Sequence, residues 1–319
     1  MKQMTMLRWL GMVVFAVMLN GCTLGPQAGQ DKTLKVGLLP ILDVLPFYIA
    51  QEKGYFEAEG IKVELVPVKS AQERDALIQA GEIEGQLTDL ISTALLDKET
   101  TQVKVVAKAR KAYPDFPQFR IVAAPGVTIS SPADLANVPI GISQNTTIEY
   151  LNDRLLGEWG LPADQIAIEE VSAIPTRFEL LMNGQIKAAL LPDPMAQAAI
   201  AAGATLIVDD TEIPQFSQSV LAFSATALEN KSDTIRAFLR AWNKAVADIN
   251  KDPNAYRDVL IEQTRVPESI QGTYNVPQFP LNEITSEAEW ADVVKWAQEK
   301  GLIEQPVAYE TAIDRSFVQ

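Results

Sequence analysis

The chain has 319 residues, of which 41 are acidic and 27 basic, so its formal net charge is −14. Its 47% hydrophobic content and mean hydropathy of +0.03 are typical of a globular protein of about two domains, and its acidic balance argues against nucleic-acid binding. Because the chain has no histidine and one cysteine, Cys22, it cannot form a Ser-His-Asp triad, a histidine or cysteine metal site or an intramolecular disulfide.

The first residues have the features of a targeting segment. Lys2 and Arg8 precede an uncharged apolar run of 11 residues, Trp9–Leu19, which fits a signal sequence and is too short to span a membrane. The run leads to Leu-Asn-Gly-Cys at 19–22, which resembles a bacterial lipobox. We therefore predict a signal peptide over 1–21, lipidation of Cys22 and a lipid-anchored linker over 22–33. The alternative is an ordinary signal peptide followed by a chance cysteine.

The remainder of the chain alternates between strand and helix patterns. In a first series, strands are expected at 34–39, 61–66, 85–88 and 103–107, with helices at 46–53, 70–80 and 90–96. In a second series, strands are expected at 120–124, 139–143, 166–171, 188–191 and 205–208, with helices from 132 and at 147–159, 175–183 and 194–202. A strand at 217–223 and helices with one apolar face at 235–249 and 287–300 follow. This alternation predicts an α/β protein whose sheets are mainly parallel.

The two series contain similar segments. In both, a helix ends at a glycine, a short apolar strand follows, and an aspartate ends the strand; these aspartates are Asp89 and Asp193. The arrangement is common, so it can arise by coincidence. We nevertheless interpret it as evidence for two similar lobes.

The order of several motifs carries a family resemblance. They are LKVGLLPILDVLPFYIAQEKGYFEAEGIKVELV at 34–66, AGEI at 80–83, SPADL at 131–135, PIGIS at 139–143, GQIKAALLPDP at 184–194 and IEQP at 303–306. Together they resemble the extracytoplasmic solute-binding proteins of ABC importers, in the branch for nitrate, sulfonates, taurine and thiamine-pyrimidine precursors. The resemblance extends over 34–319.

This resemblance implies a two-lobe periplasmic-binding-protein fold of type II. Lobe 1 would comprise 34–119 and 218–319, and lobe 2 would comprise 120–217, with crossings near Gln118–Ile121 and Gln218–Phe223. The solute would bind in the cleft between the lobes, and a hinge motion would close the cleft. The same position follows from the sheets themselves, because ligands of open α/β sheets bind beyond the carboxyl ends of the strands.

The candidate ligand-binding residues lie at predicted strand ends and helix starts. Asp43, Asp89 and Asp193 could contact the solute or could cap the helices that follow them. Arg177, in the first turn of a helix, is the best cation for a carboxylate or phosphate, although such an arginine is more often in a surface ion pair. The other candidates are Phe47, Tyr48, Thr88, Asn145, Thr146 and Thr147. The last three begin a helix, where free N–H groups suit an anion, although Thr146 and Glu149 have the spacing of a capping box.

Acids beside aromatic residues favour a solute that donates hydrogen bonds and is flat or cationic. The sequence therefore favours a vitamin or heteroaromatic precursor, such as a thiamine-type pyrimidine or riboflavin. A small anion (sulfonate, taurine or nitrate) and a solute-sensing lipoprotein without transport are the alternatives. An enzyme is not expected, because the yeast thiamine-pyrimidine synthases that share the fold depend on a histidine and a cysteine-rich motif that this chain lacks.

The expected partners follow from this interpretation. They are a small solute, an ABC permease with its cytoplasmic ATPase, and the cell membrane through the lipid anchor. We expect an extracytoplasmic monomer, on the periplasmic side if there is an outer membrane, with no metal, cofactor or nucleic acid.

Overall fold

The computed structural model describes residues 31–264 and 266–318. The predicted signal peptide and Cys22 lie outside these residues. Residues 32–319 form one compact unit. None of the helices in the described ranges has the length and apolar run required to cross a membrane.

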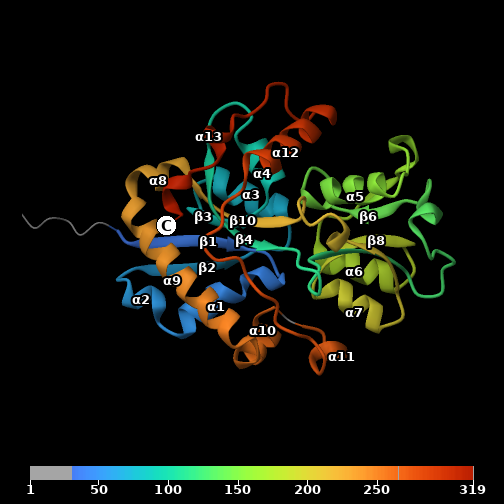
Figure 1. Cartoon of the computed structure of the whole chain (residues 1–319), viewed down its shortest axis with the longest axis horizontal. Helices are drawn as coiled ribbons and strands as arrows, with labels where there is room; N and C mark the ends of the chain where they lie inside the picture. Colours follow the sequence, from blue (N-terminus) through green and yellow to red (C-terminus); the bar gives the residue numbers. More distant parts are fainter. Residues whose placement is uncertain (1–30, 265, 319) are drawn as a thin grey trace, which may run out of the picture. The chain divides into compact units, whose positions relative to one another are not determined.

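Two five-stranded sheets form the centre of this unit (Figure 1). The first sheet has the order β2-β1-β3-β10-β4. Its strands are β1 (Thr33–Leu38), β2 (Lys62–Pro67), β3 (Gly85–Thr88), β4 (Val103–Lys111) and β10 (Gln218–Ser224). The second sheet has the order β7-β6-β8-β5-β9. Its strands are β5 (Phe119–Ala123), β6 (Ile140–Ile142), β7 (Ile168–Glu170), β8 (Ala188–Pro192) and β9 (Thr205–Asp209).

The two sheets have the same topology. In the first, β1 pairs in parallel with β2 and β3, whereas β10 runs antiparallel between β3 and β4. In the second, β6 pairs in parallel with β7 and β8, and β5 runs antiparallel between β8 and β9. Four of the five strands in each sheet therefore run in one direction, which confirms the predicted α/β class. In both sheets the antiparallel strand is the one that arrives from the other sheet.

The chain passes between the sheets twice, through 112–118 and through 210–217. Both segments lie close to the crossings that the resemblance implied. The lobe boundaries at 119/120 and 217/218 stay a prediction, since residues 32–319 form a single compact unit.

Helices cover both sheets (Figure 1). The α-helices are α1 (Leu45–Glu52), α2 (Tyr55–Ala58), α3 (Ala71–Gln79), α4 (Leu90–Leu96), α5 (Thr147–Glu158), α6 (Ile174–Met182), α7 (Met195–Ala201), α8 (Ala225–Asn230), α9 (Ser232–Lys251), α10 (Arg257–Gln263), α11 (Glu268–Gln271), α12 (Glu287–Glu299) and α13 (Tyr309–Ala312). The helix expected from residue 132 is only a 3-10 turn, Pro132–Leu135. Asn137 follows it with a φ of +58°, a conformation that ends the turn.

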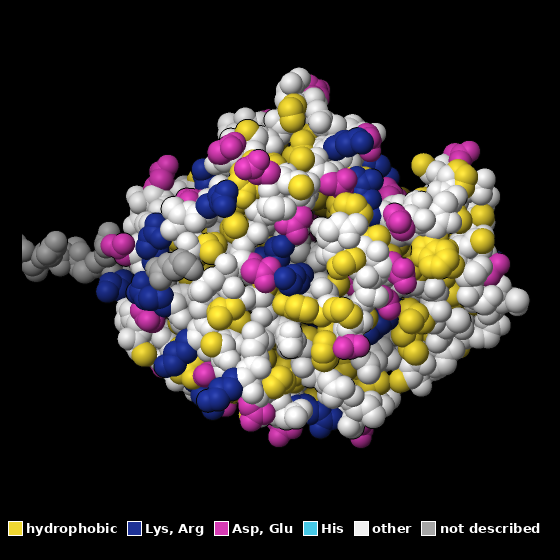
Figure 2. All heavy atoms as spheres, viewed as in Figure 1, with side chains coloured by type: hydrophobic (Ala, Val, Ile, Leu, Met, Phe, Trp, Pro, Cys, Tyr) yellow, Lys and Arg dark blue, Asp and Glu magenta, His cyan; other side chains and the backbone are white. Residues whose placement is uncertain are grey.

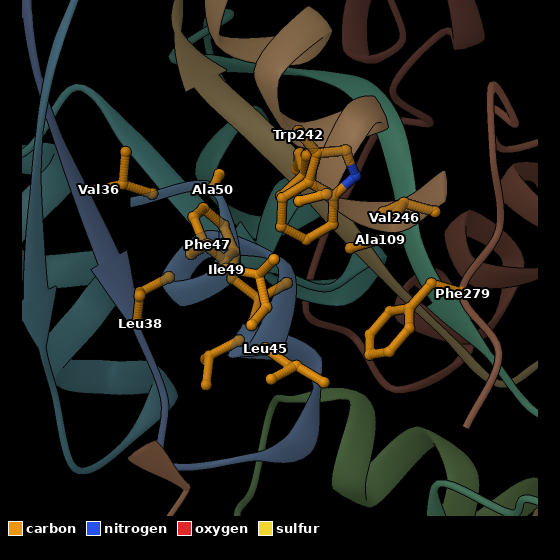
Figure 3. Packing of buried hydrophobic residues seen from close by; sticks show 14 of the residues in the cluster. Val36, Leu38, Leu45, Phe47, Ile49, Ala50, Ala109, Trp242, Val246 and Phe279 are labelled. Carbon is orange, nitrogen blue, oxygen red and sulfur yellow. The ribbon is translucent and has the colours of Figure 1, made fainter. Parts of the chain in front are cut away.

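The apolar face of α9 fills the core of the first sheet. Phe47 on α1 packs edge-on against Trp242 on α9, with ring centroids 4.6 Å apart (Figure 3). Phe56 stacks on Phe238 of the same helix at 5.5 Å. The periodic apolar residues of 235–249 therefore serve packing, as their spacing predicted.

A second core is shared by the two sheets. It joins Ile91 of α4 and Val220 of β10 to Ile121 of β5 and Leu151 of α5, and Trp296 of α12 lies in the same cluster. The C-terminal helix α12 therefore packs against parts of the chain that belong to both sheets.

The net negative charge per residue is higher on the second sheet and its helices, because basic side chains are scarce there. Residues 120–217 contain 12 acidic and 4 basic side chains, a net charge of 4 − 12 = −8 over 98 residues. The same net charge, 20 − 28 = −8, is spread over the 188 residues of 34–119 and 218–319. On the face shown in Figure 2, most lysine and arginine side chains accordingly lie over the first sheet, on the left.

Candidate functional site

The carboxyl ends of strands from both sheets meet around a cavity of about 50 Å³. The first sheet and its helices contribute Leu39, Ile41, Ala71, Arg74, Leu87, Thr88 and Asp89; the second contributes Phe119, Ser143, Thr146, Thr147, Ile148, Ser172, Ile174, Arg177 and Pro192; Gln218 and Ser219 complete the wall. We call this the strand-end cavity. It has room for a few water molecules or for a group of similar size.

Arg177 is the unusual residue of this cavity. It lies in the first turn of α6 and its side chain is 0% exposed. Its Nη1 donates to the carbonyl oxygen of Val171 at 2.9 Å, but Nε and Nη2 have no hydrogen-bond partner within the described residues. Burial lowers the pKa of Arg177 to about 10, against the opposing charge of Glu170. A buried cation with free donors is an arrangement that an anion would complete.

Glu170 does not compensate this charge directly. It is solvent-exposed, and its carboxylate accepts hydrogen bonds from the backbone N–H of Gln144, at 2.6 Å, and from the hydroxyl of Ser172. Among the described residues, no carboxylate lies within ion-pair distance of Arg177. The sequence alternative of a surface ion pair is therefore wrong for this arginine.

Thr88 and Asp89 face the same cavity from the first sheet. The hydroxyl of Thr88 is buried and has no hydrogen-bond partner in the described part of the chain. Asp89 is the N-cap of α4, where its Oδ1 accepts from the N–H of Ser92 at 2.8 Å. Its other oxygen lies 3.6 Å from Nη2 of Arg74, which is 1% exposed. Burial raises the pKa of Asp89, although Arg74 acts in the opposite direction.

The start of α5 forms another part of the wall. Thr146 is the N-cap of α5: its hydroxyl accepts from the N–H of Ile148 at 3.1 Å and donates to the carbonyl oxygen of Ser143. Glu149 accepts from the N–H of Asn145 at 2.8 Å, one residue earlier than an ordinary capping box requires. Thr147 is the first residue of α5 and lines the cavity.

One side chain connects the two sides of the cavity directly. Nε2 of Gln72, on α3, donates to the hydroxyl of Ser143 at 2.9 Å and approaches the carbonyl oxygen of Gln144 at 3.4 Å. Because α3 covers the first sheet and Ser143 follows β6, this contact holds the two sides of the cavity together.

The other predicted aspartates lie outside this cavity, where each is paired with an arginine. Asp43 forms an ion pair with Arg110 at 3.1 Å and accepts a hydrogen bond from Ser219. Asp193 forms an ion pair with Arg120. Neither caps a helix, because α1 and α7 have no side-chain cap, so that alternative is wrong for both. These four charged residues form what we call the hinge cluster, since they border the two crossings.

A second cavity, of about 160 Å³, lies beside the hinge cluster. Its walls include Arg110, Arg120, Asp193 and Tyr274. Burial raises the pKa of Asp193, against the effect of Arg120. Because each buried arginine there has its own aspartate, this cavity lacks the unbalanced charge of the strand-end cavity.

Four predicted residues line neither cavity: Asp43, described above, and Phe47, Tyr48 and Asn145. Phe47 is 0% exposed within the core of the first sheet, and Tyr48 packs at the edge of that core. Asn145 has a φ of +58° and gives its N–H to Glu149. Of the ten predicted ligand residues, the strand-end cavity brings together Thr88, Asp89, Thr146, Thr147 and Arg177.

Sequence reasoning missed several residues of these sites. They are Arg74, Ser172, Gln218 and Ser219 at the strand-end cavity, and Arg110, Arg120 and Tyr274 at the hinge. Gln218 and Ser219 begin an expected strand at a predicted crossing between the lobes. This position was the feature of the sequence that could have identified them as site residues. Arg74 lies on a polar helix, and nothing in its neighbours marks it as buried.

Comparison with known proteins identifies the family of the chain. The sequence profile described as NMT1/THI5 like matches residues 42–256, about two thirds of the chain. The chain belongs to the NMT1/THI5-like family. It is 21% identical over 311 residues to the riboflavin-binding protein RibY of Chloroflexus aurantiacus, covering 91% of this chain and 86% of that protein. It is 24% identical over 290 residues to a periplasmic binding protein of Brachyspira hyodysenteriae assigned to an ABC transporter, covering 84% and 82%.

The fold of this NMT1/THI5-like protein is also found among solved structures. The periplasmic aliphatic sulphonate binding protein SsuA of Escherichia coli superposes with a TM-score of 0.74 at 17% identity, covering 90% of this chain and 99% of SsuA. The predicted periplasmic-binding-protein fold is thereby confirmed.

Proposed function

We propose that this protein is the solute-binding component of an ABC importer and that it binds a small anion through Arg177. The relatives named above include binding proteins of transporters, which supports the first part. The second part is a change from the solute that the sequence favoured. It rests on one observation: Arg177 is 0% exposed, has no carboxylate partner among the described residues and keeps two free N–H donors.

The energetic reason is the cost of an unpaired charge. Burying an ion without a counter-ion costs several kcal/mol, and an anion in the strand-end cavity would recover part of this cost. The planar guanidinium would present Nε and Nη2 together to two oxygens of one acid group. The free hydroxyl of Thr88 supplies a donor from the opposite sheet, and the first turn of α5 adds its helix dipole.

A vitamin or heteroaromatic solute is the second candidate. It is favoured by the relative RibY, which is named as riboflavin-binding, and by the carboxylate of Asp89 in the cavity wall. A molecule of this size does not fit a cavity of about 50 Å³, so the two sheets would have to separate to admit it.

A thermal-shift and calorimetric screen tests the proposal. The panel is nitrate, sulfate, methanesulfonate, taurine, thiamine and riboflavin. An anion at 100 times its Kd should stabilise the protein by about 2.7 kcal/mol. Arg177→Met should weaken that binding by roughly 100-fold, because both free donors are lost.

Arg240→Met is the matched control, because Arg240 forms an exposed ion pair with Glu59. It should bind like the unmodified protein. Binding of riboflavin but of none of the anions would contradict the anionic solute, and turnover of a bound compound by the purified protein would contradict a binding role.

The lipid anchor and the monomeric state belong to the same proposal. Cys22→Ser should move the protein from the membrane fraction to the soluble fraction of cells, because the acylated residue is gone. Unchanged membrane retention would contradict the anchor. Light scattering of the soluble form should give the mass of one chain.

A further inference from the structure

We infer that Lys300, at the end of α12, is a positioning residue of the solute site: it neutralises Glu149 and so holds the segment 143–147 ready for an anion. The inference rests on the proposed function, because it concerns the affinity for an anion. Lys300 does not line the strand-end cavity, so it would act through Glu149 and not by contact with the solute.

Two short contacts connect Lys300 to the wall of the cavity. Its Nζ lies 2.6 Å from Oε1 of Glu149, and Oε2 of Glu149 accepts the N–H of Asn145 at 2.8 Å. Asn145 has a φ of +58°, a left-handed conformation that asparagine tolerates better than other non-glycine residues. The residues directly after it, Thr146 and Thr147, line the cavity. The ammonium group is therefore one carboxylate away from the loop that would bind the solute.

Glu149 would oppose an anion if it were left uncompensated. Its side chain is only 4% exposed and it lies in the first turn of α5, beside cavity residue Ile148. A carboxylate there carries the same charge as the proposed solute and competes with it for the positive end of the helix. Lys300 is the only cation within ion-pair distance of Glu149 among the described residues.

The charged groups around this pair have partners of their own. Asp153 accepts the indole N–H of Trp296 at 3.0 Å and also lies 3.2 Å from Lys300. Asp292 is bonded to the hydroxyl of Tyr150 and to Arg154. Burial opposes the charge of Lys300, but Glu149 and Asp153 raise its pKa above the ordinary value, so it stays charged at neutral pH.

The geometry of α12 explains why Lys300 can hold this place. The helix packs in the core shared by the two sheets through Trp290 and Trp296, and Lys300 is its C-cap. Tyr150 of α5 packs edge-on against Trp296 at 5.5 Å. Because α12 packs against residues that belong to both sheets, it provides a rigid support for α5.

The test compares Lys300→Met with three variants. Methanesulfonate is the binding probe, and the amide exchange of Asn145, followed by NMR, is a second readout that requires no solute. In Lys300→Met we expect affinity to fall roughly tenfold and the exchange of Asn145 to accelerate by a similar factor. Lys300→Arg should restore both, because it keeps the charge.

The double variant Glu149→Gln with Lys300→Met should regain most of the affinity. It removes the uncompensated charge, and the glutamine oxygen can still accept the N–H of Asn145. Lys295→Met is the matched control, because Lys295 is 72% exposed on the same helix and, among the described residues, forms an ion pair only with Glu299. It should change neither readout.

The outcomes separate this inference from the proposed function. If the unmodified protein does not bind methanesulfonate, the proposed anion loses support and the exchange of Asn145 decides the role of Lys300. If the protein binds methanesulfonate and Lys300→Met changes neither readout, the inference is overturned and the proposed function stands. A loss of affinity that the double variant does not regain overturns the electrostatic role.

Discussion

Two buried arginines at the meeting of the sheets have opposite environments. Arg110 is 1% exposed and has Asp43 at 3.1 Å and the carbonyl oxygen of Pro117 at 3.3 Å. Arg177 is 0% exposed and, among the described residues, has only the carbonyl oxygen of Val171. Both have an Nε without a partner in the same part of the chain, so a free donor alone does not distinguish them. The compensating carboxylate does distinguish them. An arginine with a carboxylate partner stabilises the fold, whereas an arginine without one is available to bind a ligand.

The largest expected effect is on stability. Arg110→Met leaves Asp43 buried without its cation, so we expect the free energy of unfolding to fall by about 3–5 kcal/mol. Arg177→Met removes a buried charge that has no counter-ion, so we expect the free energy of unfolding to stay unchanged or to rise. Urea denaturation of the two variants measures the difference. Equal losses of unfolding free energy would contradict the distinction between a structural and a ligand-binding arginine.

The next effect concerns Asp210, a buried aspartate at the start of the crossing segment 210–217. Its carboxylate accepts from the backbone N–H groups of Gln118, at 2.9 Å, and Phe119, at 3.1 Å, and from the hydroxyl of Ser217, but it forms no ion pair with any described residue. Burial raises the pKa of Asp210 to about 7. The folded state then holds a proton more tightly than the unfolded chain, so its stabilising contribution is complete below about pH 4 and is lost as the pH rises through 7.

We therefore expect the free energy of unfolding to decrease between about pH 4 and pH 7, by at most about 4 kcal/mol. Asp210→Asn should flatten this part of the profile. Urea denaturation at several pH values measures it. A variant with the same slope as the unmodified protein would assign the pH dependence to other groups.

Asp89 follows β3 and Asp193 follows β8, which are equivalent strands of the two sheets. These two aspartates test the same distinction between a ligand-binding residue and a structural one. Asp89→Ala should lose about 1 kcal/mol of stability, because α4 loses its cap, and should also change anion affinity, because Asp89 lines the cavity. Asp193→Ala should lower stability through Arg120, which it leaves unpaired, and should leave affinity nearly unchanged. Melting temperature and calorimetry on both variants separate the two roles. If both bind normally, neither aspartate belongs to the solute site.

The smallest effect is expected at Thr88. Thr88→Val keeps the shape of the side chain and removes its free hydroxyl, so stability should be unchanged or slightly higher. Affinity for the anion should fall by about three- to tenfold, which corresponds to one neutral hydrogen bond. Isothermal titration with the anion identified in the screen measures this loss. Unchanged affinity would place the anion away from the first sheet.

Most of the fold was predictable because it depends on local patterns. The strand Gly85–Thr88 and the helix Leu90–Leu96 have the bounds that their apolar runs predicted, and the apolar face of α9 packs in the core as its spacing predicted. The helix expected from residue 132 failed because the N-cap Ser131 and Pro132 suit the start of either an α-helix or a single turn. Only the packing around it decides between the two.

The site was predictable only in part. Thr88, Asp89 and Arg177 stand at strand ends or helix starts, positions that the sequence order identifies. The arginine partners of Asp43 and Asp193 lie 67 and 73 residues away along the chain, and no local pattern links them. The three aspartates therefore suggested a solute that donates hydrogen bonds, whereas each of them lies within ion-pair distance of an arginine in the fold.

The uneven charge of the molecule has a consequence for the speed of binding. With 12 acidic and 4 basic side chains in residues 120–217, an anion that approaches the second sheet meets a repulsive field. Dissolved salt screens this field beyond about 8 Å at physiological ionic strength. The association rate of an anionic solute should therefore rise with added salt, whereas a basic partner surface would be attracted to the same region and would associate more slowly as salt is added.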